Sequence, residues 1–455
     1  MLSDDFLGGV VEGFYGQPWS HSQRLHLYGE LAALGLNTYF YAPKDDLKHR
    51  AIWRETYRGA ELATLRELVQ SCDQHGVSFI YGLSPGLDIR FSDEAERNCI
   101  KARFDQLRKI GVRHFALLFD DLPGHINDGD RRAYTTLAAA QFEVTNAIYA
   151  WACEQSPGAR FLFCPTPYCD RMDRAQLGGA GYLDDLGQLL NPQIYVLWTG
   201  PEIVPKEIPL ASIERLAQRI RRPPVIWDNL FANDYDVRRL YCGPYSGRHR
   251  EVREAVRGIL VNPNNEYPIN FVPLRSFAEW LTGEGEWNPR ASFLENIAQW
   301  LPRFATAGQP LSFDDLLLLA DCFYLPHAEG PGGQRLLELI DHLLAQPVDA
   351  WGTAHEEFRA TNRRIQALFE RLTELRDREM FYAWSRRGWE LKEELQVLDA
   401  ALAYKKAGGD IEVGFELGTH LPGTYRGGLL AKMERLIEMD AQGFVRPTKS
   451  ISPQS

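Results

Sequence analysis

The sequence predicts an α/β protein, a (β/α)₈ TIM barrel followed by an all-α helical bundle or stalk. Eight short β-rich runs, each followed by a longer amphipathic stretch, occupy residues 1–285. Beyond residue 285 the amphipathic stretches continue without such runs. The length of 455 residues also suits a barrel of roughly 250 residues with a second unit behind it.

The eight runs have the character of strands buried on both faces. Several, such as Phe115-Ala-Leu-Leu-Phe119, are apolar throughout, which is typical of a parallel sheet covered on both sides. A doubly wound open sheet is the alternative, and the count of eight favours a closed barrel. The runs are residues 9–12, 37–41, 77–83, 114–119, 161–164, 194–198, 225–227 and 259–261.

Amphipathic spacing predicts the helices. Between the runs we expect helices over residues 22–34, 94–110 and 136–153, and after the barrel over 314–323, 334–344, 356–375 and 389–404. A Gly-rich region at 408–428 precedes a last expected helix at 429–439. The predicted organisation is a barrel domain at 1–285, a helical domain at 286–440 and a C-terminal tail at 441–455.

Composition and charge narrow the functional classes. Apolar residues make up 45% and charged residues 24%, which excludes a disordered, collagen-like or coiled-coil protein. The formal charge of −11 disfavours a broad nucleic-acid-binding surface. The seven cysteines show no C-x-x-C spacing, and we find neither a secretory signal nor an apolar run long enough for a membrane span. We expect a cytoplasmic protein with reduced thiols.

Polar and aromatic residues follow the ends of the runs, where a (β/α)₈ barrel places its chemistry. The run ends carry carboxylates, amides, a lysine and aromatic side chains, a mixture that suits a neutral, polyhydroxylated ligand. The segments are 12–16, 43–46, 84–88, 120–121, 165–168, 198–200, 227–229, 233–234 and 262–264.

The adjacent carboxylates Asp120 and Asp121 give the sharpest signal for chemistry. Both can reach the mouth of the barrel because the backbone turns at the end of a strand. Adjacent carboxylates repel, so we expect a raised pKa for one of them and acid/base catalysis by the pair. A helix-capping role is the alternative. The available histidines lack metal-ligand spacing and no glycine-rich phosphate loop is present, so we expect neither a metal nor another cofactor.

Several blocks in the same order resemble one enzyme family. Residues 11–19 (VEGFYGQPW) resemble the opening of the O-GlcNAcase family, glycoside hydrolase family 84, and residues 36–50 (LNTYFYAPKDDLKHR) are similar to its second strand and loop. Residues 79–88 (FIYGLSPGLD) are also similar to the family. Residues 115–121, 225–229, 232–236 and 262–264 continue the match, which covers roughly residues 9–285. The closeness extends to the animal enzymes that remove O-linked N-acetylglucosamine from proteins. The helical part carries no recognised motif.

The resemblance implies a retaining exo-β-N-acetylglucosaminidase that needs no metal. It also implies substrate-assisted catalysis, in which the 2-acetamido oxygen of the sugar attacks C1 and forms an oxazoline. In family terms Asp120 orients and polarises the acetamido N–H, and Asp121 protonates the leaving oxygen and later deprotonates water. Tyr168 is expected to hydrogen-bond the acetamido oxygen, Trp227 to line the pocket for the acetyl methyl group, and Asn229 to support the acetamido group or Asp120.

The resemblance to the family also implies the remaining contacts with the sugar. Lys44 and the backbone of Gly13 are expected to hold a ring hydroxyl. Asp234 is expected at the closed end of the pocket, with Asn262 on a further hydroxyl and Tyr235 near the leaving group. The implied partner is a glycoprotein or glycoconjugate that bears N-acetylglucosamine, and a homodimer through the helical domain is plausible on family grounds.

Three other functions stay open at this stage. An endo-acting glycan hydrolase is the nearest rival, although Asp234 at a closed end argues for exo action. A catalytically silent glycan-binding module is the second, and the intact carboxylate pair argues against it. The third is a conventional retaining glycosidase in which Asp120 is the nucleophile.

Overall fold

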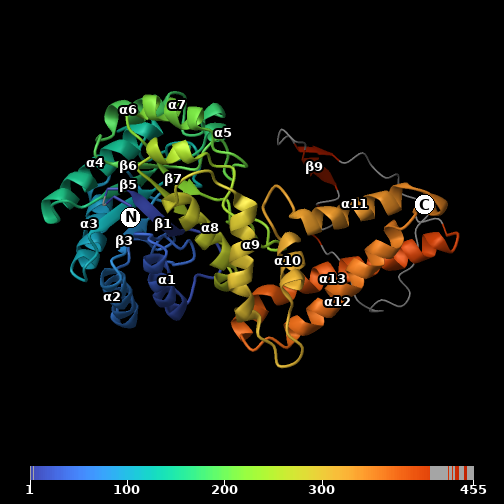
Figure 1. The fold of residues 1–455 in the computed structure, drawn as a ribbon. Coiled ribbons are helices and arrows are strands. Elements are labelled where there is room, and N and C mark those ends of the chain that lie inside the picture. The colour runs from blue at the N-terminus through green and yellow to red at the C-terminus, as the bar shows by residue number, and fades with distance from the viewer. Residues whose placement is uncertain are drawn as a thin grey trace.

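The computed structural model describes residues 2–3, 5–409, 429, 433, 436–439 and 445–447. Eight parallel strands form a closed barrel in chain order, and β1 completes the ring by pairing with β8 (Figure 1). This confirms the predicted fold class and all eight expected strands. The strands are β1 (Leu7–Glu12), β2 (Thr38–Tyr41), β3 (Ser78–Leu83), β4 (His114–Leu118), β5 (Phe161–Cys164), β6 (Tyr195–Trp198), β7 (Val225–Asp228) and β8 (Gly258–Val261).

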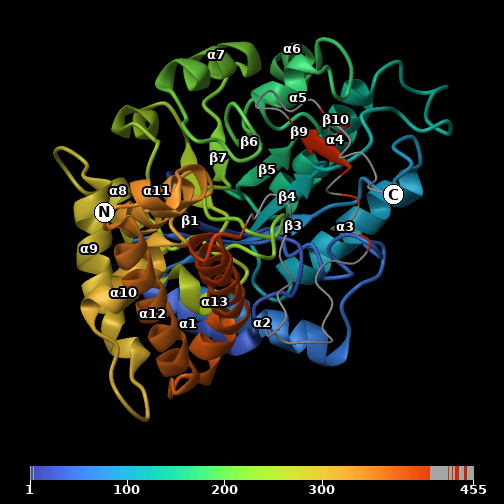
Figure 2. The ribbon, with the colours of Figure 1, turned by 90° about the vertical axis from the view of Figure 1, so that its right-hand side faces the viewer.

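Helices surround the strands, as the view in Figure 2 shows. Polar side chains begin several of them, because the first backbone N–H groups of a helix need acceptors. Ser20 and Gln23 form a capping box at α1, and Thr136 caps α4. The helices are α1 (His21–Ala33), α2 (Gly59–Gln74), α3 (Glu94–Arg108), α4 (Leu137–Gln155), α5 (Asp170–Arg174), α6 (Tyr182–Leu189), α7 (Leu210–Ile220) and α8 (Phe271–Thr282).

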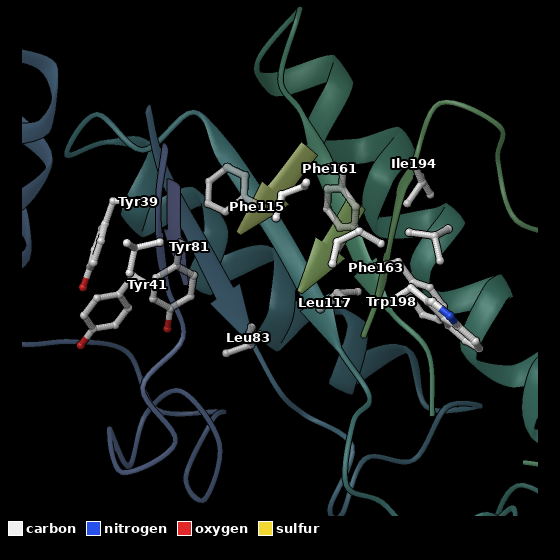
Figure 3. Close-up of a cluster of buried hydrophobic side chains, with 14 of the residues drawn as sticks. Tyr39, Tyr41, Tyr81, Leu83, Phe115, Leu117, Phe161, Phe163, Ile194 and Trp198 are labelled. Carbon is white, nitrogen blue, oxygen red and sulfur yellow. The ribbon is translucent and has the colours of Figure 1, made fainter. Parts of the chain in front are cut away.

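Alternate residues of each strand pack into two different cores. Phe115 and Leu117 of β4 pack outward in a cluster that also contains residues of the surrounding helices (Figure 3). Ala116 and Leu118 belong to a second cluster, drawn from all eight strands and the loops that follow them, which fills the barrel interior. Side chains alternate between the faces of a strand, so the period of two decides which residues beyond each strand face inward.

Five further helices follow the barrel between residues 289 and 406. They contribute to two further apolar clusters, one of which also contains Leu240, Cys242 and Ile269 of the barrel part, and α11 to α13 extend away from the barrel (Figure 1). The expected helix at 389–404 is only the second half of α13, because Gly388, which packs against Phe369 of α12, interrupts the sequence pattern without ending the helix. The helices are α9 (Pro289–Trp300), α10 (Phe313–Asp321), α11 (Pro331–Ala345), α12 (Ala354–Thr373) and α13 (Arg378–Lys406).

The beginning of α13 is tied to the rim of the barrel. Arg387 forms an ion pair of 2.5 Å with Glu266, which lies in the loop after β8, and both side chains are largely buried. Gln23 of α1 donates a hydrogen bond to Glu379 of α13. The helical part is therefore in direct polar contact with the loop that follows β8 and with the first turn of α1.

One prediction near the C-terminus is wrong in part. Leu429 and Met433 are helical, but the last three residues of the helix expected at 429–439 form strand β9 (Ile437–Met439), which pairs antiparallel with β10 (Val445–Pro447). Most of the Gly-rich region and of the tail lies outside the described residues. The division into domains at residues 285 and 440 stays a prediction. Within the described part of the chain, no helix is long and apolar enough to cross a membrane.

Candidate active site

A pocket of about 350 Å³ opens at the carboxyl ends of the barrel strands. We call it the barrel pocket. All ten residues singled out from the sequence line it: Gly13, Lys44, Asp120, Asp121, Tyr168, Trp227, Asn229, Asp234, Tyr235 and Asn262. Seven that were not singled out line it as well: Tyr15, Cys164, Trp198, Thr199, Ile203, Val204 and Ala232.

The alternation of side chains along each strand places several of these residues in the pocket. Ala116 and Leu118 face the barrel interior, so Asp120 continues the same inward series. Phe40 and Ala42 lead in the same way to Lys44. The barrel interior is packed with apolar side chains, and the polar residues follow where the strands end.

Asp120 and Lys44 form a buried ion pair at the floor of the pocket. Burial opposes the ionised form of Asp120, but the Lys44 ammonium, helped by Arg50, holds the pKa of this carboxyl below its usual range. The expected repulsion within the carboxylate pair therefore does not raise the pKa of Asp120. Its second oxygen, Oδ1, is buried without a hydrogen-bond partner among the described residues.

The backbone turns away from the direction of the strand at Asp121, which adopts a left-handed conformation with φ of 52°. Its carboxylate accepts two hydrogen bonds, from the hydroxyl of Tyr168 at 2.7 Å to Oδ1 and from that of Tyr15 at 2.8 Å to Oδ2. Burial and the negative charge of Asp121 raise the pKa of both tyrosines above the usual range. Both phenols therefore stay protonated and remain donors.

Trp227 forms the apolar wall of the pocket and packs against Gly13. A Cβ atom on Gly13 would lie 2.0 Å from Cζ2 of Trp227, so the indole occupies its position only because residue 13 is glycine. The ring also contacts Phe40, with centroids 5.7 Å apart, and the Lys44 ammonium lies 5.7 Å from its centroid. Close packing against Gly13, Phe40 and Lys44 fixes the position of the Trp227 ring.

Two asparagines present oriented amides beside this wall. Oδ1 of Asn229 accepts hydrogen bonds from the indole N–H of Trp227 at 3.1 Å and from Nδ2 of Asn262 at 3.0 Å. Nδ2 of Asn229 donates to the Ile203 carbonyl at 2.8 Å. These contacts leave Oδ1 of Asn262, which lines the pocket, buried without a partner in the described part of the chain.

Asp234 and Tyr235 complete the pocket from the loop after β7. Oδ2 of Asp234 accepts a hydrogen bond from the backbone N–H of Tyr15 at 2.9 Å, and burial raises the pKa of the Asp234 carboxyl. Tyr235 is 55% exposed, and its hydroxyl lies 2.9 Å from that of Tyr241. Asp234 is thus held at the pocket, whereas Tyr235 stands at its outer edge.

A second hollow of about 510 Å³, which we call the α13 cleft, adjoins the barrel pocket and shares Tyr15 and Asp234 with it. Its far wall is formed by residues of α13, among them Tyr382 and Arg387. A ligand in the barrel pocket could therefore extend past Tyr15 toward α13.

The residues that were missed differ in how well the sequence marks them. Tyr15 stands in the quoted motif at 11–19, but nothing in the spacing shows that its hydroxyl reaches Asp121. Ile203 and Val204 come from an irregular loop between β6 and α7, which has no periodicity to read. Across the described residues, no group of three or more histidine, cysteine or acidic side chains is placed to hold a metal ion.

The fold and the pocket, with adjacent carboxylates beside aromatic and amide groups at the mouth of a (β/α)₈ barrel, are typical of a glycoside hydrolase. A family model described as beta-N-acetylglucosaminidase matches residues 8–310. The chain belongs to this family, the O-GlcNAcase family or glycoside hydrolase family 84, as the sequence motifs predict.

Individual relatives agree with this assignment. The proteins named Protein O-GlcNAcase of Rattus norvegicus and Mus musculus are each 46% identical over 275 residues, which is 60% of this chain and 30% of the relative. The chain thus matches less than a third of the length of these curated relatives. A solved structure of a mutant Thermobaculum terrenum O-GlcNAc hydrolase aligns with a TM-score of 0.72 at 28% identity, over 88% of this chain and 82% of that one.

Proposed function

We propose that the protein is a retaining exo-β-N-acetylglucosaminidase that removes N-acetylglucosamine from the serine or threonine of a protein, or from a related glycoconjugate. The 2-acetamido oxygen of the sugar attacks C1, and an oxazoline forms as the leaving group departs. One observation carries the proposal. Asp120 is held ionised by Lys44, and its buried second oxygen has no hydrogen-bond partner in the described structure.

Asp120 is the group that makes the acetamido oxygen nucleophilic. Its free Oδ1 accepts a hydrogen bond from the acetamido N–H, which orients the amide and stabilises the positive charge that develops on nitrogen as the ring closes. A nucleophile held in the same molecule gains from effective molarities on the order of 10⁵–10⁸ M. The pocket therefore has to position the acetamido group and supply the negative charge, and the sugar itself supplies the nucleophile.

Asp121 serves as the general acid and base. The protonated carboxyl of Asp121 gives its proton to the leaving oxygen as the C1–O bond breaks, and the resulting carboxylate takes a proton from the water that opens the oxazoline. In the free enzyme the carboxylate accepts from both Tyr15 and Tyr168. When the sugar binds, Tyr168 turns its hydroxyl to the acetamido oxygen and thereby releases Oδ1 of Asp121.

The remaining side chains hold the sugar. Trp227, with Tyr168, encloses the acetyl methyl group, and Asn229 fixes the indole. Oδ1 of Asn262, Asp234 and Lys44 with the Gly13 backbone bind the hydroxyls. A pocket of about 350 Å³ is at the small end of the range for ligand sites, which suits a single terminal sugar and exo action.

The aglycone leaves the pocket past Tyr15 and Tyr235. The α13 cleft begins at Tyr15 and offers room for the chain that carries the sugar. The name of the rodent relatives, Protein O-GlcNAcase, supports a protein as that carrier.

The test is hydrolysis of aryl β-N-acetylglucosaminides that carry zero to three fluorines on the acetyl group. Fluorine withdraws electrons from the acetamido oxygen, so kcat/KM should fall steeply along the series. The product should be released as the β-anomer, which proton NMR of the first turnover products shows. A flat series with good turnover would mean that a protein side chain is the nucleophile, with Asp120 as the candidate.

Asp120→Asn provides the matched variant, because it keeps the size of the side chain and removes its charge. It should lose activity even with activated aryl leaving groups, since oxazoline formation itself suffers. Near-normal turnover would remove Asp120 from the mechanism, and no hydrolysis by the wild-type protein would favour a glycan-binding module.

A further inference from the structure

Arg50 is a buried arginine that contacts the backbone of Asp121, one of the two adjacent acids. It lies in the segment between β2 and α2 and is 8% exposed. Its Nη2 donates to the main-chain carbonyl of Asp121 at 3.2 Å, and its Nη1 donates to Oγ of Ser84 at 3.3 Å. The guanidinium also lies 5.9 Å from the centroid of the Tyr15 ring. The contacts thus run to the backbone of Asp121 and to a ring that binds its side chain.

The charge of Arg50 has no close counter-ion. Among the described residues, no carboxylate lies within ion-pair distance of its guanidinium, although buried arginines are normally paired. The Lys44 ammonium, in contrast, is paired directly with Asp120. Within the described part of the chain, Arg50 is therefore a positive charge without a direct ion-pair partner, close to two adjacent acids.

The backbone of Asp121 explains why such a contact is useful. A positive φ is uncommon for an aspartate, and here it turns the chain so that the side chain of Asp121 enters the pocket directly after that of Asp120. The forked guanidinium bonds at one side to Ser84, which follows β3, and at the other to the turned carbonyl. It links the ends of two neighbouring strands at the point where the carboxylates diverge.

We propose that Arg50 is a positioning residue for hydrolysis, which holds the Asp121 backbone in the turned conformation and places a fixed positive charge behind the carboxylate pair. The inference rests on the proposed function, because it concerns the same two carboxylates. Arg50 does not line the barrel pocket, so it acts through Asp120 and Asp121 and not through the sugar.

Apart from Arg50 and Lys44, no group near Asp120 in the described structure supplies a positive charge. Burial lowers the pKa of His49 to about 4, so this imidazole is neutral at working pH. The nearby tyrosines and Cys164 have pKa values raised by burial and are neutral too. The titratable and charged groups that face Asp120 are Tyr15, Lys44, His49, Arg50, Asp121, Cys164 and Tyr168.

Two substitutions separate the geometric role from the charge. Arg50→Met removes both, whereas Arg50→Lys keeps the charge but cannot reach Ser84 and the Asp121 carbonyl together. With an alkyl or poor aryl leaving group, Arg50→Met should lower kcat/KM on the order of 100-fold, which is what a misplaced catalytic group costs. The loss should be smaller with an activated aryl group, which needs little help from Asp121.

The pH profile supplies the second readout. Without the positive charge, the acid limb of kcat/KM, which reports ionisation of Asp120, should move to higher pH in Arg50→Met. Arg50→Lys should keep the acid limb of the wild type and still show the larger loss with poor leaving groups. Arg54→Met is the matched control, because Arg54 lies in the same segment but pairs with Asp88 and Glu96 away from the pocket.

The outcomes decide between clear alternatives. Wild-type activity in Arg50→Met overturns the inference. An equal loss with all leaving groups, with the acid limb unmoved, shows a merely structural role and also overturns it. If Arg50→Met does not fold, Arg50→Lys alone decides through its leaving-group dependence. A fluorination series in which kcat/KM of the wild type stays flat would contradict the proposed mechanism. The comparison of the Arg50 variants with the wild type could still be interpreted in that case.

Discussion

The phenol of Tyr168 donates a 2.7 Å hydrogen bond to Oδ1 of Asp121. The residue assigned to the acetamido oxygen therefore binds the assigned general acid in the free enzyme. In the proposed mechanism, sugar binding exchanges one acceptor of the Tyr168 hydroxyl for the other. The proposal therefore predicts that filling the acetamido site frees the Asp121 carboxyl from Tyr168.

Replacing Tyr168 by phenylalanine tests this exchange. The variant loses a donor to an oxygen on which charge changes during ring closure, and hydrogen bonds to charged groups contribute about 1.5–3 kcal/mol. We expect kcat/KM to fall roughly 10- to 100-fold. Steady-state kinetics on an aryl substrate measure it. Unchanged kinetics would place the phenol outside the reaction.

Asp121→Asn should discriminate between leaving groups. The amide cannot donate the proton that a poor leaving group needs, so we expect the largest loss with alkyl and weakly acidic aryl glycosides and the smallest with activated ones. A plot of log kcat/KM against the pKa of the leaving group should be steeper than for the wild type. Parallel plots would refute the assignment of Asp121 as the general acid.

Lys44→Met should make activity depend on pH in a defined direction. Burial disfavours the charged carboxyl, and Lys44 is the main group that lowers the pKa of Asp120. Without the ammonium the pKa of Asp120 rises, so a larger fraction is protonated at a given pH. The acid limb of kcat/KM should move to higher pH, and raising the pH should restore part of the lost activity. A uniform loss at every pH would contradict this account.

Gly13→Ala should damage the site more than the fold. The new methyl group would overlap Trp227, so the indole must shift and the wall for the acetyl group with it. We expect a loss of at least tenfold in kcat/KM with a modest change in thermal stability, because a loop can yield more readily than a core. Both are measurable on purified protein.

Gly29→Ala is the control for that substitution. Gly29 lies within α1, and its Cβ would meet His75 at an ordinary contact distance of 3.7 Å. Alanine in a helix should raise stability by about 0.5–1 kcal/mol and leave activity unchanged. Equal activity losses in the two variants would show that the Trp227 contact is not the cause.

Asp315 gives a prediction for the helical part alone. Burial opposes its charge, but hydrogen bonds from Arg364, Ser312 and Arg371 lower its pKa from 3.8 to about 2. A lowered folded-state pKa contributes stability that is complete above the unfolded value and is lost as the pH falls toward 2. The difference corresponds to roughly 2 kcal/mol at neutral pH. Asp315→Asn should remove it, so denaturant titrations should show the gap to wild type shrinking from pH 5 to pH 2.

The barrel could be read from the sequence because its physics is local and periodic. Each strand is a short apolar run, and the inward series from Ala116 through Leu118 leads to Asp120 at a fixed period of two. The motifs then supplied identities for the residues at the strand ends. All ten selected residues line one pocket, while the roles assigned to them stay predictions.

The parts that escaped prediction depend on contacts between distant segments. The first turns of α13 carry Ser385, Arg386 and Gly388, and they are helical because they pack on α12 and on the barrel rim. The bond from Tyr15 to Asp121 joins residues 106 positions apart. The strand at 437–439 exists by pairing with 445–447, which no helical periodicity reveals.

The ion pair between Arg387 and Glu266 connects α13 to the loop after β8. From Arg387 to the end of the helix at Lys406 the backbone runs about 28 Å, at 1.5 Å per residue. Glu266 in turn accepts a hydrogen bond from Asn233, the neighbour of Asp234, at 2.9 Å. Two polar contacts in series, Arg387 to Glu266 and Asn233 to Glu266, thus connect α13 to the residue beside Asp234, which lines the barrel pocket.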